Sequence, residues 1–321
     1  MPLFISSSKS TEQGVRRAIV SLLCCLLVFC VLLELVTAVG IRRVSRIQRR
    51  IWQDYTGALA LKPEAGGEQK SILVAGNSLL LLGVDFPTLQ AGLAPRYKSA
   101  RFAVEQTQYL DWQFGLRRLF REGSRPDVVV LCLPVNHLIA SGTRGEYFAH
   151  YMMDGRDILD VAKEAKLDNT TASNYFFANR SAWLGSRMEV RKWLLGTMMP
   201  SVQALTYMFQ RPAPPPPPGD EVRRQMVVRL GELKRICESN GARLIIVIPP
   251  TLDKSDRSSA VRQAGVETGV PVLLPYQPGE LQASFFDHDL FHLNPEGAKV
   301  FAARLAADLL TTLSPASTPP A

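Results

Sequence analysis

The stretch SILVAGNSLL, from Ser71 to Leu80, decides the fold class because it contains the first strong strand signal of the chain. Its first residues are apolar without alternation, which is the pattern of a strand covered on both faces. Similar runs recur along the chain: ARFAV at 100–104, DVVVLCL at 127–133, RLIIVIP at 243–249 and VPVLLP at 270–275.

Helical patterns lie between these runs, for example at 109–122 and at 223–240, where Asn240 and Gly241 make a good helix end. Strands that alternate with helices predict an α/β fold, here a three-layer α/β/α sandwich around a parallel sheet. We expect this domain to span residues 70–312.

Residues 146–209 interrupt the alternation, because they are rich in aromatic residues and methionine and contain no clear strand. They predict a helical insertion over one end of the sheet. A proline-rich spacer follows at 211–219, and residues 313–321 predict a disordered tail.

The N-terminal region contains an apolar run at 18–40, interrupted by the single charge of Glu34 and preceded by a polar tail at 1–17. As a helix this run is roughly 34 Å long, enough to cross the hydrocarbon core of a bilayer. The alternative is a cleaved signal peptide, but the run is longer than a usual signal core and lacks a convincing cleavage site. We therefore expect one uncleaved transmembrane helix.

Basic residues flank the apolar run on both sides, and a basic juxtamembrane segment and linker occupies 41–69. The positive-inside rule alone would place the domain in the cytoplasm, but long domains cross membranes largely regardless of charge. Residues 42–52 resemble an amphipathic helix that could lie on anionic lipid. The net charge is +8 and the isoelectric point is near 9.4, yet the basic residues are scattered, so we expect no nucleic-acid partner.

A candidate nucleophile, Ser78, follows the first strand in the order Gly76-Asn77-Ser78. A serine at this edge of the sheet lies near a helix N-terminus, where backbone N–H groups can stabilise a developing oxyanion. The alternative is that Asn77 or Ser78 only caps the following helix.

A second group of polar residues, Asp289 and His292, precedes a clear helix start at Asn294-Pro295. The spacing of three residues allows the carboxylate to accept a hydrogen bond from the imidazole. A histidine oriented in this way can take the proton of a serine hydroxyl. On its own, Asp-x-x-His is more often a solvated loop histidine.

Together the two groups resemble the SGNH (GDSL-type) hydrolase superfamily, whose members have a flavodoxin-like α/β/α fold. Gly76-Asn77-Ser78 resembles the serine block of that family, and Asp289 to His292, continued by HLNPEG, resembles its Asp-x-x-His block. The resemblance spans 71–310 and implies that Ser78 attacks an ester carbonyl, His292 is the base and Asp289 orients it. The rival carboxylate, Asp287, lies five residues from His292 and is expected to be a loop residue.

The resemblance also implies an oxyanion hole, formed by the backbone N–H of Ser78 and by two middle blocks of the family. The Gly-x-Asn-Asp block corresponds to Pro134-Val135-Asn136-His137, in which only Asn136 is kept. The glycine block falls at 104–107, where this chain has no glycine and where Gln106 or Thr107 is expected to substitute. Asn77 stands in place of the usual aspartate.

By this resemblance the chain is expected to be a bacterial membrane-anchored serine esterase that acts on an acyl, chiefly acetyl, ester of a cell-surface carbohydrate. The catalytic domain would then be periplasmic. The alternatives are an O-acetyltransferase that receives its acyl group from a membrane partner protein, and an inactive protein that only binds a glycan. The sequence predicts no metal ion and no cofactor, because the histidines, cysteines and glycines show no ligand or nucleotide-binding spacing.

Overall fold

The computed structural model describes residues 8–63, 69–199 and 217–314. At its centre lies a sheet of parallel strands in the order β2-β1-β3-β4-β5. The strands are β1 (Lys70–Gly76), β2 (Tyr97–Ala103), β3 (Val128–Cys132), β4 (Arg243–Val247) and β5 (Val272–Leu273). Each coincides with an apolar run of the sequence.

The register of the strands brings their carboxyl ends to one edge. Gly76 at the end of β1 is paired with Ala103 of β2 and with Cys132 of β3. β5 is shorter than predicted, because Pro271 and Pro275 flank it and proline has no N–H to donate to a neighbouring strand. The loops that follow β1, β2 and β3 therefore begin side by side.

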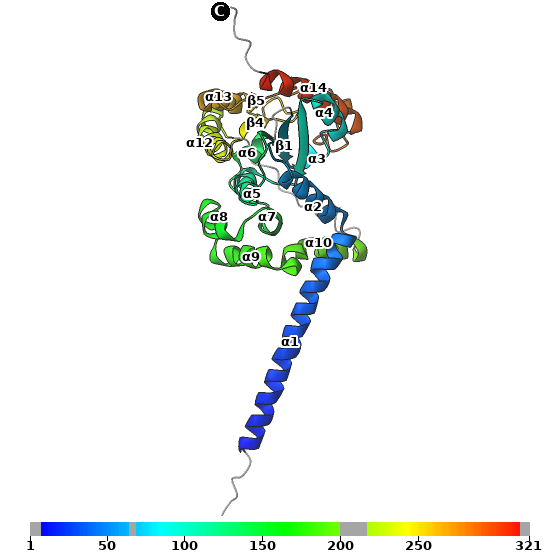
Figure 1. Ribbon diagram of the computed structural model, residues 1–321, viewed down its shortest axis with the longest axis vertical. Coiled ribbons are helices and arrows are strands. Elements are labelled where there is room, and N and C mark those ends of the chain that lie inside the picture. The colour runs from blue at the N-terminus through cyan, green and yellow to red at the C-terminus, as the bar shows by residue number, and fades with distance from the viewer. Residues whose placement is uncertain (1–7, 64–68, 200–216, 315–321) are drawn as a thin grey trace, which may run out of the picture.

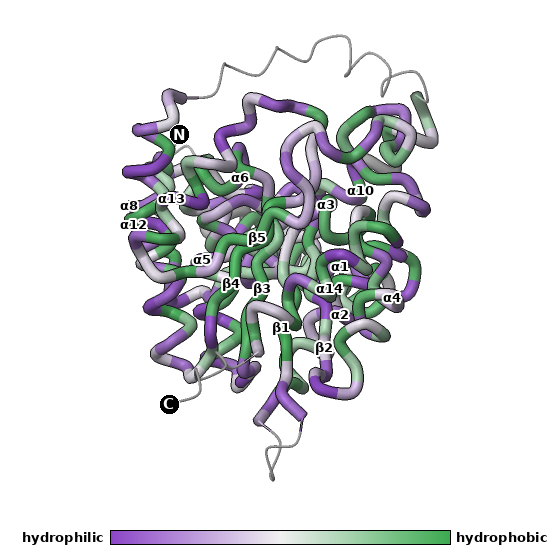
Figure 2. The backbone as a smooth tube through the Cα atoms, turned by 90° about the horizontal axis from the view of Figure 1, so that it is seen from above, coloured by the Kyte–Doolittle hydropathy of each residue, from purple (hydrophilic) through white to green (hydrophobic). Residues whose placement is uncertain are grey.

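Helices cover both faces of the sheet, as the three-layer prediction requires (Figure 1). One face carries α3 (Ser78–Leu81), α4 (Phe86–Leu93) and α14 (Pro295–Leu313); the other carries α2 (Arg46–Leu59), α5 (Tyr109–Arg121), α12 (Gly219–Glu238) and α13 (Ser258–Thr268). Alternate residues of β1 belong to two separate apolar cores, with Ile72 on the α14 side and Leu73 on the α5 side. Figure 2 shows the apolar strands between these helices. The predicted fold class is confirmed.

The inserted region forms an additional layer of helices: α7 (Glu146–Tyr151), η1 (Gly155–Asp157), α8 (Ile158–Glu164), α9 (Asn169–Arg180) and α10 (Ala182–Met198). It packs on the outer side of α5, where the rings of Phe114 and Phe148 lie 6.3 Å apart. The expectation that it lies over one end of the sheet is wrong, since its apolar residues are buried against α5 (Figure 1). Two short elements complete the fold, α6 (Val135–Ile139) and η2 (Ala283–Phe285).

Several predicted segments fall partly outside the described residues. These are the N-terminal tail up to residue 7, part of the linker at 64–68, the end of the insertion and most of the proline-rich spacer at 200–216, and the C-terminal tail from 315.

The long helix α1 (Ser8–Val44) projects from the domain (Figure 1). Its segment Gln13–Ile41 is long and apolar enough to cross a membrane, and extends beyond the predicted run at both ends. Its apolar side chains are mostly exposed: Leu22, Leu27 and Phe29 each expose more than half of their surface. Among the described residues, none buries the apolar window of this segment.

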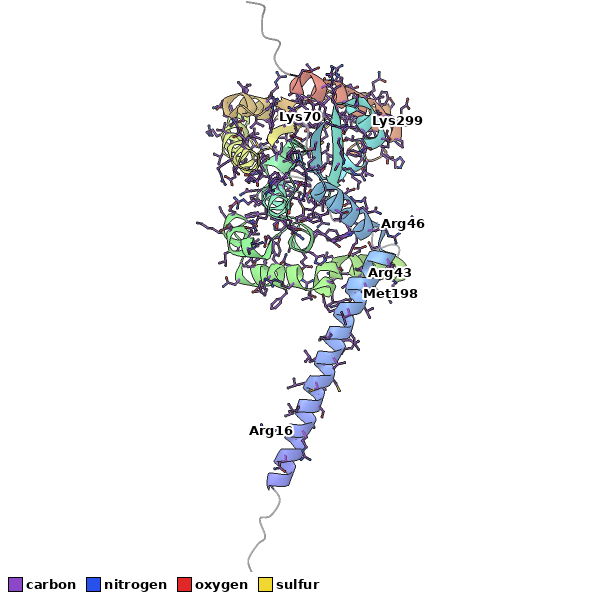
Figure 3. The ribbon with its side chains drawn as sticks, viewed as in Figure 1. Arg16, Arg43, Arg46, Lys70, Met198 and Lys299 are labelled. Carbon is purple, nitrogen blue, oxygen red and sulfur yellow. The ribbon has the colours of Figure 1, made fainter. Side chains whose placement is uncertain are left out.

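One face of the helix after α1 is covered by the domain and is not available to lipid, whereas Ile47 and Trp52 within 42–52 are exposed. Ile51, Tyr55 and Ala58 of α2 are buried in the apolar core beside Phe102. Asp54 also accepts hydrogen bonds from Arg101 and from the backbone N–H of Ala103. An amphipathic pattern identifies an apolar face but not what covers it. The folded part therefore includes α2, which begins at Arg46, labelled in Figure 3.

Candidate active site

Ser78 is the first residue of α3, directly beyond β1. The Asn77 side chain caps this short helix, since its Oδ1 accepts the backbone N–H of Leu79 at 3.0 Å. Gly76 is required here, because a Cβ atom at this position would lie 2.4 Å from the carbonyl oxygen of Cys132. Asn77 therefore caps the helix while the adjacent, half-buried Ser78 stands at its N-terminus.

The structure brings Ser78, His292 and Asp289 into one hydrogen-bonded chain. His292 Nε2 lies 3.0 Å from Ser78 Oγ, and His292 Nδ1 lies 2.6 Å from Asp289 Oδ2. Ser78 and His292 are 214 positions apart in the sequence. They meet because α3 and α14 lie on the same face of the sheet, and the turn before α14 reaches its carboxyl edge.

A tight turn holds Asp289 against His292. Leu290 adopts a φ of 55°, and the backbone N–H groups of Phe291 and His292 each donate to Asp289 Oδ1 at 2.9 Å. Asp287 lies 3.1 Å from the exposed ring of His288 instead. This carboxylate contacts a different histidine from the one beside Ser78.

The surroundings of Asp289 favour its ionised form. Partial burial opposes ionisation, but hydrogen bonds from the His292 ring and from the backbone N–H groups of His292 and Phe291 outweigh it and lower the pKa of Asp289 to about 2. The carboxylate is therefore charged at neutral pH and can stabilise a protonated imidazole beside it.

Of the residues expected to replace the missing glycine, Gln106 has the backbone conformation that glycine favours, with a φ of 62°. Its loop runs beside the serine block, since the N–H of Val104 donates to the carbonyl of Gly76 at 3.0 Å. A backbone N–H from Gln106 is consequently the better candidate for this part of the oxyanion hole.

The side chain of Thr107 is engaged in other contacts. Thr107 is completely buried, and its hydroxyl donates to the carbonyl of Val104 at 2.7 Å and accepts the indole N–H of Trp112 at 2.9 Å. The hydroxyl therefore closes the loop after β2 and joins it to α5.

Asn136 lies on α6, directly beyond β3, and is exposed. Its Oδ1 accepts the backbone N–H of His137 at 3.0 Å, so the amide nitrogen is the remaining donor of this side chain. The carbonyls at the end of α6 are held by α12, because Gln225 and Arg229 donate to Ile139 and Ala140.

Two further residues support the site and were missed by the sequence analysis. His137 Nδ1 lies 2.8 Å from the amide nitrogen of Asn77 and 3.0 Å from the carbonyl oxygen of Thr107. These contacts join the loops after β1, β2 and β3. The only available signal was that Asn77 and His137 both depart from the family blocks.

Arg50 of α2 is the second such residue. Its guanidinium donates to the carbonyl of Ala103 and to both carboxylate oxygens of Glu105, each at 2.6 Å. The sequence offered no sign of this contact, because Arg50 lies in a basic stretch that is equally compatible with binding to a membrane surface. The helix that follows α1 is thus attached to the loop that carries Gln106.

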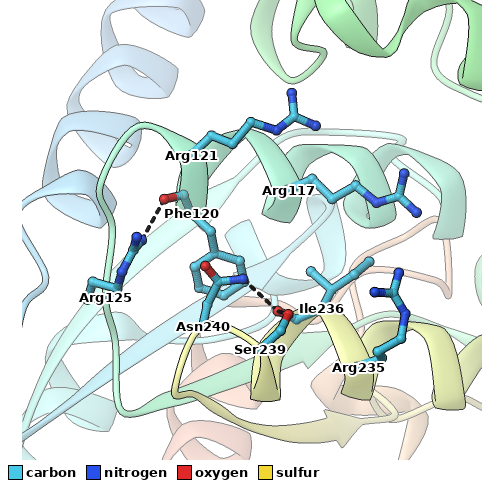
Figure 4. A pocket seen from close by; sticks show the side chains of 8 residues that line it. All are labelled: Arg117, Phe120, Arg121, Arg125, Arg235, Ile236, Ser239 and Asn240. Carbon is cyan, nitrogen blue, oxygen red and sulfur yellow. Dashed lines mark hydrogen bonds between the residues drawn. The ribbon is translucent and has the colours of Figure 1, made fainter.

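A separate surface pocket lies near the amino ends of β3 and β4, away from Ser78 (Figure 4). Four arginines line it, but three of them are ion-paired: Arg117 and Arg235 with Glu232, and Arg121 with Asp154 and Asp157. The fourth, Arg125, donates to the backbone carbonyl of Phe120. These arginines hold neighbouring helices together and do not belong to the serine site.

Comparison with known proteins finds distant structural likenesses. No protein-family model matches the chain, and no curated protein matches it in sequence. Among solved structures, TesA is 11% identical, with 76% of this chain and 100% of that chain covered and a TM-score of 0.39. Axe2, an acetylxylan esterase from Geobacillus stearothermophilus, is 14% identical (78% and 95% covered, TM-score 0.37). A carbohydrate esterase family 2 enzyme with a carbohydrate-binding domain, from Corynascus thermopiles (Myceliophthora fergusii), is 12% identical (78% and 69% covered, TM-score 0.42).

Proposed function

We propose that this chain is a membrane-anchored serine esterase that works through an acyl-enzyme. The observation that carries the proposal is the chain of contacts from Ser78 Oγ to His292 Nε2, at 3.0 Å, and from His292 Nδ1 to Asp289, at 2.6 Å. Nucleophile, base and orienting carboxylate stand in hydrogen-bonding order, as serine acyl chemistry requires.

In the proposed reaction, Ser78 Oγ attacks the carbonyl carbon of an ester while His292 Nε2 takes the hydroxyl proton. Backbone N–H groups of Ser78 and Gln106 and the Asn136 amide stabilise the negative charge on the carbonyl oxygen. The ester C–O bond then breaks, and His292 donates its proton to the departing alcohol. Water, deprotonated by His292, releases the acyl group from Ser78.

Exposed apolar side chains beside the site support an acyl ester as substrate. Leu82, Leu290 and Phe291 expose 53%, 57% and 42% of their surface, and the ring of Phe291 lies 5.1 Å from that of His292. Apolar surface with a few polar groups at its centre is typical of small-molecule sites. By the family resemblance, we infer an acetyl ester of a cell-surface carbohydrate and a periplasmic domain.

Acetyl transfer to a sugar hydroxyl is a second candidate, because it uses the same three residues. The contact of Arg50 with the loop of Gln106 favours it, since α2 joins this loop to the end of α1, where a membrane protein could deliver an acyl group. An inactive binding protein would not need the aligned Ser78, His292 and Asp289 contacts.

The test is p-nitrophenyl acetate turnover by the purified full-length chain, compared with Ser78→Ala and with Ser173→Ala, a serine on the exposed face of α9. We expect Ser78→Ala to lose at least about 10³-fold in kcat and Ser173→Ala to be unchanged. Mass spectrometry should find the acyl adduct on Ser78.

Adding oligosaccharide acceptors then separates the two reactions, since transfer yields an acetylated sugar and hydrolysis yields acetate. Equal activity of Ser78→Ala and the unsubstituted chain would refute the nucleophile assignment.

A further inference from the structure

Glu34, the single charge in the apolar run of α1, binds the beginning of α10. The Ser181 hydroxyl donates to the Glu34 carboxylate at 2.7 Å and the backbone N–H of Trp183 donates at 3.2 Å, and the N–H of Ala182 donates as well. A carboxylate at a helix N-terminus satisfies free N–H groups and compensates the positive end of the helix dipole. Glu34 therefore holds α10 against α1 within the apolar span.

The depth of this contact follows from helix geometry. Arg17 and Glu34 are separated by the sixteen residues 18–33, which is roughly 24 Å of helix. A hydrocarbon core of about 30 Å that begins at residue 18 would end roughly 5 Å beyond Glu34. Helices that lie in a membrane interface sink by about 5–10 Å. The start of α10 thus falls at the depth of an interfacial helix.

The two faces of α10 have different surroundings. Its inner face packs on α2, where Gln48 donates to Ser186 at 3.1 Å and to Glu189 at 2.8 Å. Its outer face carries Met188, Leu194 and Met198, which expose 37%, 43% and 76% of their surface. With 3.6 residues per turn, Met188 and Met198 lie about 100–180° around the helix from Ser186 and Glu189, whereas Leu194 lies only about 80° from Ser186.

The neighbouring helix α9 continues this apolar surface. Its exposed residues are polar in the first half, whereas the second half exposes Phe176 and Phe177, by 42% and 54% of their surface, together with the terminal Arg180. The second half is the one that leads into α10. We name the five residues of both helices the outer stripe: Phe176, Phe177, Met188, Leu194 and Met198.

Basic residues lie within and beside the outer stripe, since Arg191 falls between Met188 and Met198 on the outer face of α10. Arg180 and Arg191 are exposed on α9 and α10, and Arg43 is exposed at the end of α1. Figure 3 labels Arg43 on α1 and Met198 on α10, and these two helices are in contact. Apolar side chains bordered by arginines suit the boundary between acyl chains and anionic headgroups.

We propose that α10 and the second half of α9 lie in the membrane interface beside α1, with the outer stripe in contact with lipid. The inference rests on the proposed membrane anchor, and lipid is favoured over a partner protein because the contacts of Glu34 hold the start of α10 within the apolar span of α1. Two attachments, α1 and the outer stripe, then set the orientation of the catalytic domain on the membrane.

The test uses the full-length chain in nanodiscs of phosphatidylcholine and phosphatidylglycerol, with Cys24, Cys25 and Cys30 replaced by serine. Single cysteines at Phe177→Cys or Met198→Cys carry an environment-sensitive fluorophore, while the native Cys132 and Cys237 are buried and unreactive. Leu27→Cys in α1 reports on the anchor. Val266→Cys on α13, 81% exposed, is the water control.

Lipids with a nitroxide near the headgroup end of the acyl chain should quench positions 177 and 198 at least about twofold more than position 266. Lipids with a deep nitroxide should quench position 27. If position 27 is quenched while 177 and 198 behave like 266, the interfacial helices are refuted and the anchor stands, which would leave a partner protein to cover the stripe. If position 27 is not quenched, the anchor itself fails, and this inference fails with it.

Discussion

Asp289, proposed to orient His292, is held in the ionised form by three hydrogen bonds. In Asp289→Asn the amide presents a donor or a weaker acceptor to His292, so we expect kcat to fall by about 10³- to 10⁴-fold while KM changes little. The measurement is p-nitrophenyl acetate hydrolysis over a pH series. Because the pKa of Asp289 is about 2, its protonation should not limit activity above about pH 4.

The matched control is Asp287→Asn, which removes the rival carboxylate beside His288. We expect this variant to stay within about twofold of the unsubstituted chain. If both variants lost kcat equally, the proposal that Asp289 is the carboxylate partner of the base His292 would be contradicted.

Gln106 is strained by its left-handed backbone conformation. Gln106→Gly should relieve this strain and raise the free energy of unfolding by about 1 kcal/mol. Since the proposed oxyanion donor is the backbone N–H, turnover should remain within about threefold. Thermal unfolding and ester hydrolysis measure both effects, and loss of turnover with retained stability would show that the Gln106 side chain takes part in the reaction.

The helix α2 supports the site through Arg50. Removing this side chain in Arg50→Ala leaves the Glu105 carboxylate and the Ala103 carbonyl without their donor, so we expect a stability loss of about 1–3 kcal/mol. A positioning role further predicts a fall in kcat for p-nitrophenyl acetate at nearly constant KM. Activity and denaturant unfolding of the same preparations measure the two effects.

Arg46→Ala is the matched control, because Arg46 lies on the same helix and is exposed. Arg46→Ala should change neither kcat nor the free energy of unfolding. If Arg50→Ala lost stability without any change in kcat, Arg50 would stabilise the fold but would not position the site.

The stability of the whole domain should depend on pH through Asp111, a completely buried carboxylate at the start of α5. Burial raises the pKa of Asp111 to about 7, although the backbone N–H groups of Arg144 and Gln108 donate to it. Between about pH 4 and pH 7 the folded chain therefore keeps a proton that the unfolded chain has released. The free energy of unfolding should fall as the pH rises through this window.

Unfolding of Asp111→Asn, measured across the same window, should show a smaller slope with pH. Asp160→Asn, an exposed carboxylate of α8, should keep the original slope. An identical slope in Asp111→Asn would assign the pH dependence to other groups.

Local patterns in the sequence were sufficient for the α/β/α layers, whereas the three residues of the candidate triad were predicted from the resemblance of two short blocks to a known family. Uninterrupted apolar runs specify buried strands, because a parallel strand is covered on both faces. Strand ends and helix starts carry short-range signals, which placed Ser78 after β1 and His292 before α14. Parallel strands with helices between them bring such positions to one edge, so this meeting follows from the topology.

The tertiary structure alone decided what covers each apolar face and which distant groups meet. The pattern of α2 suits lipid or protein equally, and only packing showed Ile51 and Tyr55 in the core. Gln106 or Thr107 was expected to substitute for the missing glycine, and the structure shows that the Thr107 hydroxyl binds Trp112 while the left-handed backbone lies at Gln106. Glu34 meets Ser181 across 147 positions of sequence. The periodicity of a sequence indicates the type of one helix or strand and which of its faces is apolar. These contacts depend instead on how several helices and strands are placed relative to one another.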